Sequence, residues 1–556
     1  KVGKVQPSLK FDLRGAQIEA CTRHGIFSPV YISVRVDQHM AEKHQEWVGR
    51  LRDGTLWGPS ALQSHWYNLC TNHNDYIDYL EAQTVEVLEN YDADGFFFDM
   101  CYPPPGAGCY CAECIRLMRD KGIDIADDEA HRKMEYELTR AYTQRLTKVI
   151  RQHKKNATIY FNGRVSLDIR REMDVFTHLE AETLPIWGYF LFPYRVRMIR
   201  QMAPATQGMT ARFHLSWADF GGIKQREQLE YEAGTIIGNG AVMNIGDQLH
   251  PRGVLDKAAY KLIGEVYGQV KEKEPWCLRA KAVTDIAVLV LPEKPGVPVL
   301  NEAESDGGAG RMLFGLKHQW NVEVSDSDIS RYKVLIIPDR GIVDAHLRGK
   351  LARFLDDGGS IVFSDEATLD NKTGKFMCPG TPVKYAGKCE YTPSYMKLGK
   401  VMGAGLPDTM LVMYEKGSYV TPIKGATAMG NVVSSYFNRD YHHFCSHFQT
   451  PYDKTLKYPV AVKKGNVVYL YASIFKSFHN SNYFVYKGIL ANVLEMLLPN
   501  PLIKAECPAA MEVSLMRQAK EDRYIVHLIN FQPQRQTGNM QYIENVWPSM
   551  DVVVRV

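Results

Sequence analysis

The stretch DGFFFDM at residues 94–100 decides how this sequence is expected to fold. Three consecutive phenylalanines indicate a short buried strand, and the acidic residue Asp99 follows them directly. Similar apolar runs precede and follow this stretch, and amphipathic helices are predicted between them at 76–91 and 129–153. These runs lie at residues 30–37, 158–163, 175–182, 208–217 and 240–247, with a further strand considered around 55–69.

Strands that alternate with helices predict parallel βαβ units, and over residues 1–278 they predict a catalytic (β/α)8 barrel of the TIM type. No leading strand is visible before residue 11. We therefore expect either that the first barrel strand is missing from this chain or that the barrel is irregular.

Two further domains are predicted after the barrel. Buried strands at 285–292 and 332–339 begin a flavodoxin-like, doubly wound α/β domain over residues 279–503. Pro499 lies close to its end, and the pattern then changes to alternating strands. We expect residues 504–556 to form a small C-terminal β-sandwich that is truncated at its end.

Composition excludes several classes of protein. With 45% hydrophobic and 23% charged residues, the 556-residue chain is neither disordered nor fibrous. A net charge of +3 predicts no nucleic-acid partner, and no apolar run reaches the length of a membrane span, about 18 residues. Eleven cysteines are an odd number for a disulfide framework, so we expect a cytoplasmic protein, or a periplasmic one if a leader is missing.

Polar side chains stand at the ends of the predicted barrel strands. Because the carboxyl ends of parallel strands share one face of a barrel, these side chains are expected to meet at an active site. They are Asp37, Asp99, Asn162, Glu180, Glu182, Trp217, Asp219 and Asp247. Strand alternation places His178, Glu180 and Glu182 on one face. Together with Asp99 this gives two carboxylates from different strands, the pair that glycoside hydrolysis needs. The alternative is that the glutamates pair with a barrel arginine such as Arg212.

Other residues are predicted to contact a substrate. Trp217 can form a wall for a sugar face, and nearby histidines can donate to hydroxyl groups. The candidates outside the strand ends are His39, Glu46 and Trp47 in the loop 36–50, Trp187, His214, His250, and His443 in the segment 435–451. The last segment could reach the barrel mouth in its own subunit or in a neighbour's. Core polar networks or plain surface loops are the alternatives.

A cysteine-rich loop follows the DGFFFDM strand. Cys109, Cys111 and Cys114 form a C-x-C-x2-C pattern, Cys101 precedes them, and Cys70 lies farther back. Four thiolates can close a tetrahedral zinc site, for which Cys101, Cys109, Cys111 and Cys114 are the predicted set. The alternative is free thiols in a proline-rich loop. No cofactor is expected to be required for catalysis.

Four segments together resemble a known group of barrel glycosidases. They are GFFFDMCYPPPGAGCYCAEC, THLEAETLPIWGYFLFP, RFHLSWADFGG and GDQLHPRG. The group was first catalogued as hypothetical glycoside hydrolases and overlaps α-L-fucosidase family 151. The part from 285 to 365 is similar to the β-galactosidase trimerisation domain found beside family 42 barrels, which implies a homo-oligomer, with a trimer favoured.

The resemblance implies a retaining exo-glycosidase of the α-L-fucosidase type, acting on a carbohydrate. Phe98–Asp99 matches the context of the nucleophile in the related family 29, and Glu182, shortly before a W-G-Y that includes Trp187, matches the acid/base, with Glu180 as the neighbouring choice. Family 42 enzymes can carry a zinc cluster with the C-x-C-x2-C pattern, but their acid/base context does not match FDM. The alternatives are a β-galactosidase or other exo-glycosidase, and a non-catalytic carbohydrate-binding or scaffold protein.

Overall fold

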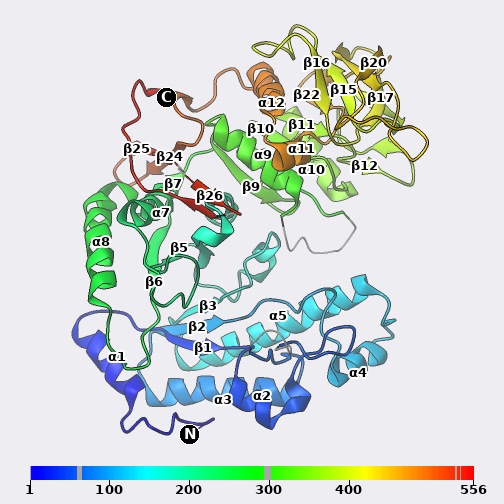
Figure 1. Ribbon diagram of the computed structural model, residues 1–556. Helices are drawn as coiled ribbons and strands as arrows, with labels where there is room; N and C mark the ends of the chain where they lie inside the picture. The colour runs from blue at the N-terminus through cyan, green and yellow to red at the C-terminus, as the bar shows by residue number, and fades with distance from the viewer. Residues whose placement is uncertain (1, 59–65, 294–301, 533–534, 539) are drawn as a thin grey trace. The chain divides into compact units, whose positions relative to one another are not determined.

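The computed structural model describes residues 2–58, 66–293, 302–532, 535–538 and 540–556 and shows a mixed α/β fold (Figure 1). The chain forms two compact units. The first unit comprises residues 1–180 with 202–205, and the second comprises residues 181–201 with 206–556. Among the described residues, no helix combines the length and the apolar character that crossing a membrane requires.

Three parallel strands form the sheet of the first unit. In sheet order they are β1 (Val30–Ser33), β2 (Gly95–Asp99) and β3 (Thr158–Phe161). The helices of this unit are α1 (Leu13–Arg23), α2 (Gln38–Lys43), α3 (Asn74–Asn90), α4 (Ala112–Asp120) and α5 (Asp128–His153). Phe96 and Phe98 are both buried, and the Phe98 ring stacks on Phe161 of β3 at 4.9 Å. The phenylalanine run therefore forms the predicted buried strand, and it lies in the middle of this sheet.

A second parallel sheet continues the alternation of strands and helices. Its strands, in order, are β4 (Leu179–Glu182), β5 (Thr206–Ala211) and β6 (Val242–Gly246). The helices that follow them are α6 (Leu191–Ile199), α7 (Arg226–Gly238) and α8 (Lys257–Cys277). Strand and helix positions thus follow the sequence pattern over the first half of the chain.

The expected closed barrel is not formed within the described ranges, where the parallel strands make two three-stranded sheets. Thr177, just before β4, gives the physical reason for the break beside β3. Its backbone N–H donates to the carbonyl of Ile159 at 3.1 Å, but the Ile159 N–H donates to the Thr177 hydroxyl at 2.9 Å. A side chain thus replaces one bond of the strand ladder.

The expectation of a further strand around residues 55–69 is corrected as well. Leu56 and Leu69 make only isolated antiparallel bridges, to Arg50 and Val48, and no strand of the described chain is placed there. Residues 59–65 lie outside the described residues.

A seven-stranded sheet dominates the part after residue 285. Its order is β18-β21-β22-β11-β10-β8-β9, and the five strands from β22 to β9 are parallel. Continuous apolar runs such as IAVLV and VLII explain this, because strands of parallel sheets are covered on both faces. The strands are β8 (Ile286–Val290), β9 (Trp320–Val324), β10 (Val334–Ile337), β11 (Ser360–Ser364), β18 (Thr427–Met429), β21 (Ala461–Lys464) and β22 (Val467–Leu470). The helices are α9 (Glu304–Gly315), α10 (Ala345–Asp356), α11 (Ile474–Ser481) and α12 (Phe484–Leu497).

Short strands that sequence reasoning did not find lie between β11 and β21. Those of one four-stranded sheet are β16 (Met410–Met413), β15 (Ser394–Lys397), β19 (Asn431–Ser435) and β20 (Tyr452–Thr455). The paired ones are β12 (Leu369–Asp370) with β13 (Lys375–Phe376), and β14 (Val383–Lys388) with β17 (Ser418–Pro422). β16 is the short apolar run MLVM, and the others mix polar and apolar types over six residues or fewer, so no clear periodicity marks them.

The last part of the chain forms small antiparallel sheets. The central one joins β24 (Glu512–Gln518), β25 (Arg523–Ile529) and β7 (Lys281–Ala282). The others pair β23 (Lys504–Glu506) with β28 (Val553–Arg555), and β26 (Arg535–Thr537) with β27 (Met540–Tyr542). The C-terminal sheet is therefore completed by a strand from before residue 285.

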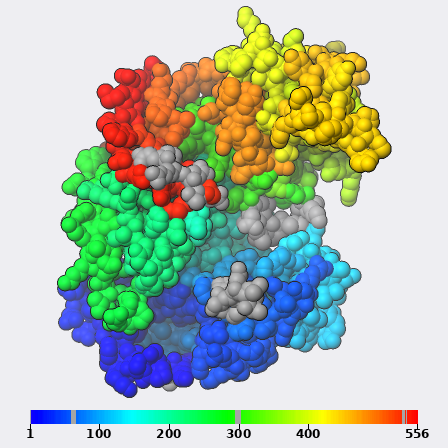
Figure 2. All heavy atoms as spheres, viewed as in Figure 1, coloured from blue at the N-terminus to red at the C-terminus, as the bar shows by residue number. Residues whose placement is uncertain are grey.

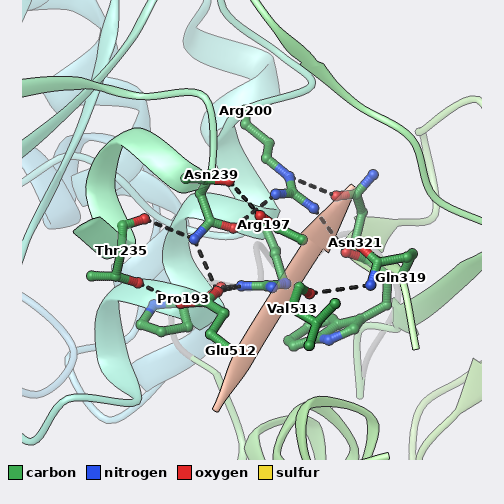
Figure 3. Close-up of polar contacts among 12 residues, drawn as sticks. Pro193, Arg197, Arg200, Thr235, Asn239, Gln319, Asn321, Glu512 and Val513 are labelled. Atoms are coloured by element: carbon green, nitrogen blue, oxygen red, sulfur yellow. Dashed lines mark hydrogen bonds and ion pairs between the residues drawn. The ribbon is translucent and has the colours of Figure 1, made fainter. Parts of the chain in front are cut away.

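The buried carboxylate of Glu512 joins three of these elements (Figure 3). Glu512 is only 1% exposed. Its Oε1 accepts hydrogen bonds from Arg197 of α6 and Asn239, both at 2.9 Å, and its Oε2 accepts one from Thr235 of α7 at 2.5 Å. A buried charge is tolerated only when it is paired and hydrogen-bonded, so this contact fixes α6 and α7 against β24.

Arg200, at the end of α6, extends the same network toward β9 (Figure 3). Its guanidinium donates to the side-chain oxygens of Asn321 and Asn239 at 3.0 and 2.9 Å, and to the carbonyl of Trp320 at 3.1 Å. Burial lowers the pKa of Arg200. The polar contacts thus connect the second parallel sheet's helices with the seven-stranded sheet.

Glu512→Gln is expected to destabilise the second unit strongly. The amide keeps the shape but removes the charge, which leaves the cation of Arg197 buried without its counter-ion. Breaking a buried pair costs about 3–5 kcal/mol. Urea unfolding should show this loss, while Glu506→Gln, which removes an exposed pair with Arg555, should change stability by less than about 1 kcal/mol. Equal effects of the two substitutions would contradict the assignment.

Candidate active site

Asp99 closes strand β2 and its carboxylate is held by three donors. The hydroxyl of Tyr31 on β1 donates to Oδ2 at 2.5 Å. The amide nitrogen of Asn162 and the backbone N–H of Met100 donate to Oδ1 at 2.9 and 2.8 Å. Burial and the Asp99 contact raise the pKa of Tyr31, so its phenol stays protonated and remains a donor.

The backbone directly after Asp99 is held in an unusual conformation. Met100 has φ of 59°, a region that non-glycine residues rarely adopt and that occurs preferentially at functional sites. The N–H of Asn162 donates to the carbonyl of Phe98 at 2.7 Å, and Cys101 N–H donates to the carbonyl of Asn162 at 2.8 Å. The structure therefore brings together Asp99 and Asn162, two of the predicted strand-end residues.

His178 and Glu180, which flank the start of β4, are placed differently from Glu182. His178 stacks on Tyr160 at 5.1 Å, and burial lowers its pKa. Glu180 is 2% exposed, whereas Glu182, two residues later, is partly exposed. Of the two glutamates, Glu182 is the one that solvent or a substrate can reach.

The loop after β1 begins with a capping residue. Asp37 is the N-cap of α2, where its Oδ1 accepts from the N–H of Met40 at 3.0 Å, and its Oδ2 accepts from the Tyr79 hydroxyl at 3.2 Å. His39 is partly buried, and its Nε2 has no partner within the described chain. Asp37 thus has a local structural role.

Glu46 and Trp47, from the same loop, do not form an open sugar wall. Glu46 is paired with Nδ1 of His44 at 3.0 Å, and its pKa is lowered by hydrogen bonds from the backbone and from His44. The Trp47 ring is 7% exposed and stacks on His44 at 3.9 Å, with Tyr76 beside it at 5.4 Å. That Trp47 lines a sugar pocket stays a prediction: its ring is largely buried, and the partly exposed His44 stacks on it.

In the second unit, Trp217 orients Glu182. The indole Nε1 donates to Oε2 of Glu182 at 3.1 Å. The Trp217 ring packs against Gly246 at the end of β6, where a Cβ would lie 2.3 Å from the ring, and against the cluster that contains Phe213. The close approach requires glycine at position 246, and it fixes the indole that holds the carboxylate.

Arg212 pairs with Asp247 rather than with a strand-end glutamate. The contact between its Nε and Oδ1 of Asp247 is 2.9 Å, and both side chains are largely buried. They line a pocket of about 420 Å3 within the second unit together with Phe220, His250 and Arg252. Asp247 and His250 therefore share one concave surface, whose lining mixes polar and apolar side chains.

The remaining predicted residues are scattered. Asp219 accepts from the N–H of Leu215 at 3.1 Å and so closes a turn, and His214 is partly buried. Trp187 is 41% exposed. His443 lies in an exposed loop, where its Nδ1 is 3.0 Å from Asp440. The chain around residues 400–450, yellow to gold in Figure 2, forms part of the molecular surface in that view.

Four buried cysteines gather in the first unit, but the set differs from the predicted one. The potential ligand atoms of Cys70, Cys109, Cys111 and Cys114 all lie within 4.8 Å of one another. Cys101 is outside the group, and its thiol donates to the carbonyl of Phe98 at 3.6 Å. The fourth member is thus Cys70, which lies far away in sequence and which spacing alone could not single out.

The donor set fits zinc. Four soft sulfur atoms within reach of one ion are the arrangement that structural zinc sites use. Asn72 Nδ2 donates to Sγ of Cys114 at 3.1 Å, and the N–H of Arg50 donates to Sγ of Cys109 at 3.4 Å. Such N–H donors stabilise thiolates and orient them.

Sequence reasoning missed Tyr31 as a partner of the site, and it named Arg212 as a possible partner of the glutamates, not of Asp247. In the strand register, Tyr31 lies opposite Phe97 on β2, two residues before Asp99. Alternation therefore sends Tyr31 and Asp99 to the same face of the sheet, a signal that becomes readable only once the pairing of β1 with β2 is known.

Comparison with known proteins gives a consistent class. A family model described as "Hypothetical glycosyl hydrolase 6" matches residues 1–100, which include β1, β2 and Asp99. A search of curated proteins finds no match.

Solved structures give longer matches. The α-L-fucosidase isoenzyme 2 from Paenibacillus thiaminolyticus is 32% identical, with 99% of this chain and 83% of that chain covered and a TM-score of 0.91. The β-galactosidase from Bacillus circulans sp. alkalophilus is 12% identical, with coverage of 92% and 85% and a TM-score of 0.69. That from Rahnella sp. R3 is 12% identical, with 92% and 86% covered and a TM-score of 0.67.

A fold of parallel βα units whose strands end in carboxylates, matched by these enzymes, defines a glycoside hydrolase that acts on carbohydrate. Within that class, the chain belongs to the same family as the Paenibacillus α-L-fucosidase, because the identity extends over almost its whole length. The two β-galactosidases, at 12% identity, show likeness of fold alone.

Proposed function

We propose that the protein is a retaining exo-glycosidase of the α-L-fucosidase type, which removes a terminal sugar through a covalent glycosyl-enzyme. The observation that carries the proposal is the carboxylate of Asp99, held at the end of β2 by Tyr31 and Asn162. The choice of sugar is supported by the activity named for the relative that is 32% identical.

In the first step, Asp99 attacks the anomeric carbon and the bond from that carbon to the leaving oxygen breaks. Glu182 gives its proton to the leaving oxygen. In the second step, water adds to the anomeric carbon, Glu182 takes a proton from that water, and the ester bond to Asp99 breaks. Greater exposure supports Glu182 over Glu180 for this role, and Trp217 orients the carboxyl group.

Asp247 and His250 support a place for sugar hydroxyl groups, because both polar side chains line the same pocket of the second unit. Arg212 fixes the Asp247 carboxylate by a close ion pair. We assign the same kind of role to His214, whose imidazole can hydrogen-bond a hydroxyl group.

The larger organisation is part of the proposal. We infer a catalytic part of the (β/α)8 type over residues 1–278, a trimerisation-like part over 279–503 and a β part over 504–556. We also infer a homotrimer, in which the exposed segment 435–451 with His443 reaches a neighbouring copy. The extent of exposed aromatic surface in that segment supports an interface, because Tyr441 and Phe448 are 95% and 89% exposed.

We also propose that the four-cysteine group holds a structural zinc ion. Zinc would link Cys70, before α3, to the loop that leaves the Asp99 strand, and so would brace the site without taking part in catalysis. No group other than side chains is needed for the two chemical steps.

Asp99→Ala is expected to lower the hydrolysis of 4-nitrophenyl α-L-fucoside by about 10³-fold or more, because the glycosyl-enzyme cannot form. Azide should restore turnover and give a fucosyl azide of inverted configuration, since the small anion takes the place of the carboxylate. The β-galactoside is assayed beside it. Turnover of the galactoside alone would show a β-galactosidase and contradict the fucosidase assignment. Near-normal hydrolysis by the variant would contradict the assignment of Asp99 as the nucleophile. Turnover of neither substrate would favour the carbohydrate-binding alternative.

Glu182→Gln and Glu180→Gln form a matched pair, because the two glutamates are two residues apart on one strand. The loss of the acid should matter most for poor leaving groups, so Glu182→Gln should slow methyl α-L-fucoside far more, by about 10²-fold or greater, than the nitrophenyl substrate. Glu180→Gln should affect both substrates equally. The reverse pattern would exchange the roles of Glu180 and Glu182.

Metal analysis of the purified protein is expected to find one zinc per chain. Cys70→Ser should lower this content and make the protein more sensitive to urea, because the fourth ligand is lost. Cys101→Ser is the matched control, since this thiol is equally buried but lies outside the group. If the Cys70 variant keeps its zinc and the Cys101 variant loses it, the ligands are instead the four cysteines expected from the sequence, which include Cys101.

A further inference from the structure

A second pocket, of about 230 Å3, lies in the second unit and shares no lining residue with the one that contains Asp247. One wall comes from the segment that follows β4, and the other comes from α9 and α11. The lining residues are Trp187, Phe190, Leu191, Tyr194, Glu302, Ala303, Glu304, Gly307, Arg311 and His479. None of the proposed catalytic groups belongs to it.

Polar groups in this pocket lack protein partners. The hydroxyl of Tyr194, a residue only 2% exposed, is buried without a hydrogen-bond partner in the described part of the chain, and so is Nδ1 of His479. Buried polar atoms are nearly always hydrogen-bonded in folded proteins, so such atoms at a pocket call for an occupant. Burial lowers the pKa of His479, and its neutral ring offers both a donor and an acceptor.

Arg311 adds a charged hydrogen-bond donor whose orientation is fixed by an aromatic ring. Its guanidinium stacks over Phe190 with 4.4 Å to the ring centroid. Among the residues that the structure describes, no carboxylate forms an ion pair with it, and only desolvation shifts its pKa, downward. The stacked guanidinium therefore keeps donors for a ligand in a fixed plane.

The charges around the pocket favour a neutral ligand. Glu302 and Glu304 are exposed at its edge, and Lys476 lies 3.9 Å from Glu304. Lys476 is closer to Glu415, at 3.3 Å, so Glu302 and Glu304 offset the charge of Arg311, and an anion such as a phosphate or a carboxylate gains no net attraction. The pocket instead suits a sugar. Its hydrogen-bond donors and acceptors can bind the hydroxyl groups, and the half-exposed ring of Trp187 can contact the apolar face.

The position of Trp187 relates this pocket to the leaving group. Trp187 lies on the turn that follows Glu182 directly in the chain, within the short helix Pro185–Trp187. Glu182 is the residue assigned to protonate the leaving oxygen. The residues that follow it in the chain are therefore placed to contact the leaving group. We propose that this pocket binds a neutral pyranose on the leaving-group side of an oligosaccharide substrate. The proposal rests on the glycosidase function and names its substrate class.

The kinetic test compares 2′-fucosyllactose with 4-nitrophenyl α-L-fucoside, whose leaving group has no sugar. Arg311→Ala should lower kcat/KM for the trisaccharide by about tenfold and change that for the nitrophenyl substrate less than about twofold. Trp187→Ala should show the same selectivity. Arg348→Ala, an exposed arginine on α10, is the matched control and should alter neither substrate. Equal losses on both substrates, or no loss on either, would overturn the proposal.

A binding measurement separates this proposal from the proposed activity. Lactose and N-acetyl-D-glucosamine are titrated into the wild type, Arg311→Ala and Arg348→Ala, with heat of binding as the readout. Saturable binding of one sugar that is weakened only in the Arg311 variant would support the pocket even if no fucoside is hydrolysed. Binding of neither sugar, or binding that Arg311→Ala leaves unchanged, would overturn the pocket even if fucosidase activity is found.

Discussion

The buried carboxylate of Glu512 is the contact on which the second unit depends. Its two oxygens accept hydrogen bonds from α6, α7 and the residue after α7, although about three hundred residues separate Glu512 from Arg197. An ionised carboxylate without these donors would be too costly to bury, and so would the arginine without the carboxylate. The strands after residue 504 are therefore a part of the structure that positions α6. Along the chain, α6 follows β4, which ends at Glu182, and the short helix that carries Trp187.

Parallel strands explain why chemistry-bearing residues meet at their carboxyl ends. On β2 the chain leaves the sheet at Asp99, and the neighbouring strands supply Tyr31 and Asn162 as donors at fixed spacing. On β4 the same geometry exposes Glu182, which the indole of Trp217 then orients. Asp99 is thus held by groups on, or directly after, the adjacent strands β1 and β3. Glu182 is held by Trp217, which lies in the turn after β5 and whose ring packs closely on Gly246 of β6.

A feature of the fold or of the site could be predicted from the sequence when neighbouring residues determine it. The buried strand around Phe98 and the helices at 74–90 and 128–153 follow from periodicity, and Asp99 and Asn162 follow from their place at strand ends. Cys70 could not be found in this way, because the fold brings it to the other cysteines over a long separation. The break in the sheet at Thr177 depends on one hydroxyl that replaces a backbone acceptor, a choice between two hydrogen bonds that no pattern encodes.

Helix α6 carries two kinds of polar side chain, and the contrast between them is informative. Arg197 is anchored by Glu512, so it contributes to stability. Tyr194, one turn earlier on the same helix, is equally buried and has a hydroxyl without a partner among the described residues. A phenylalanine at this position would keep the packing and avoid the cost of burying the hydroxyl group. Helix α6 is thus fixed near its end by an ion pair, and nearer its start it carries a hydroxyl group without a partner. This is the arrangement expected of a pre-organised binding surface, in which the ligand supplies the missing hydrogen bond.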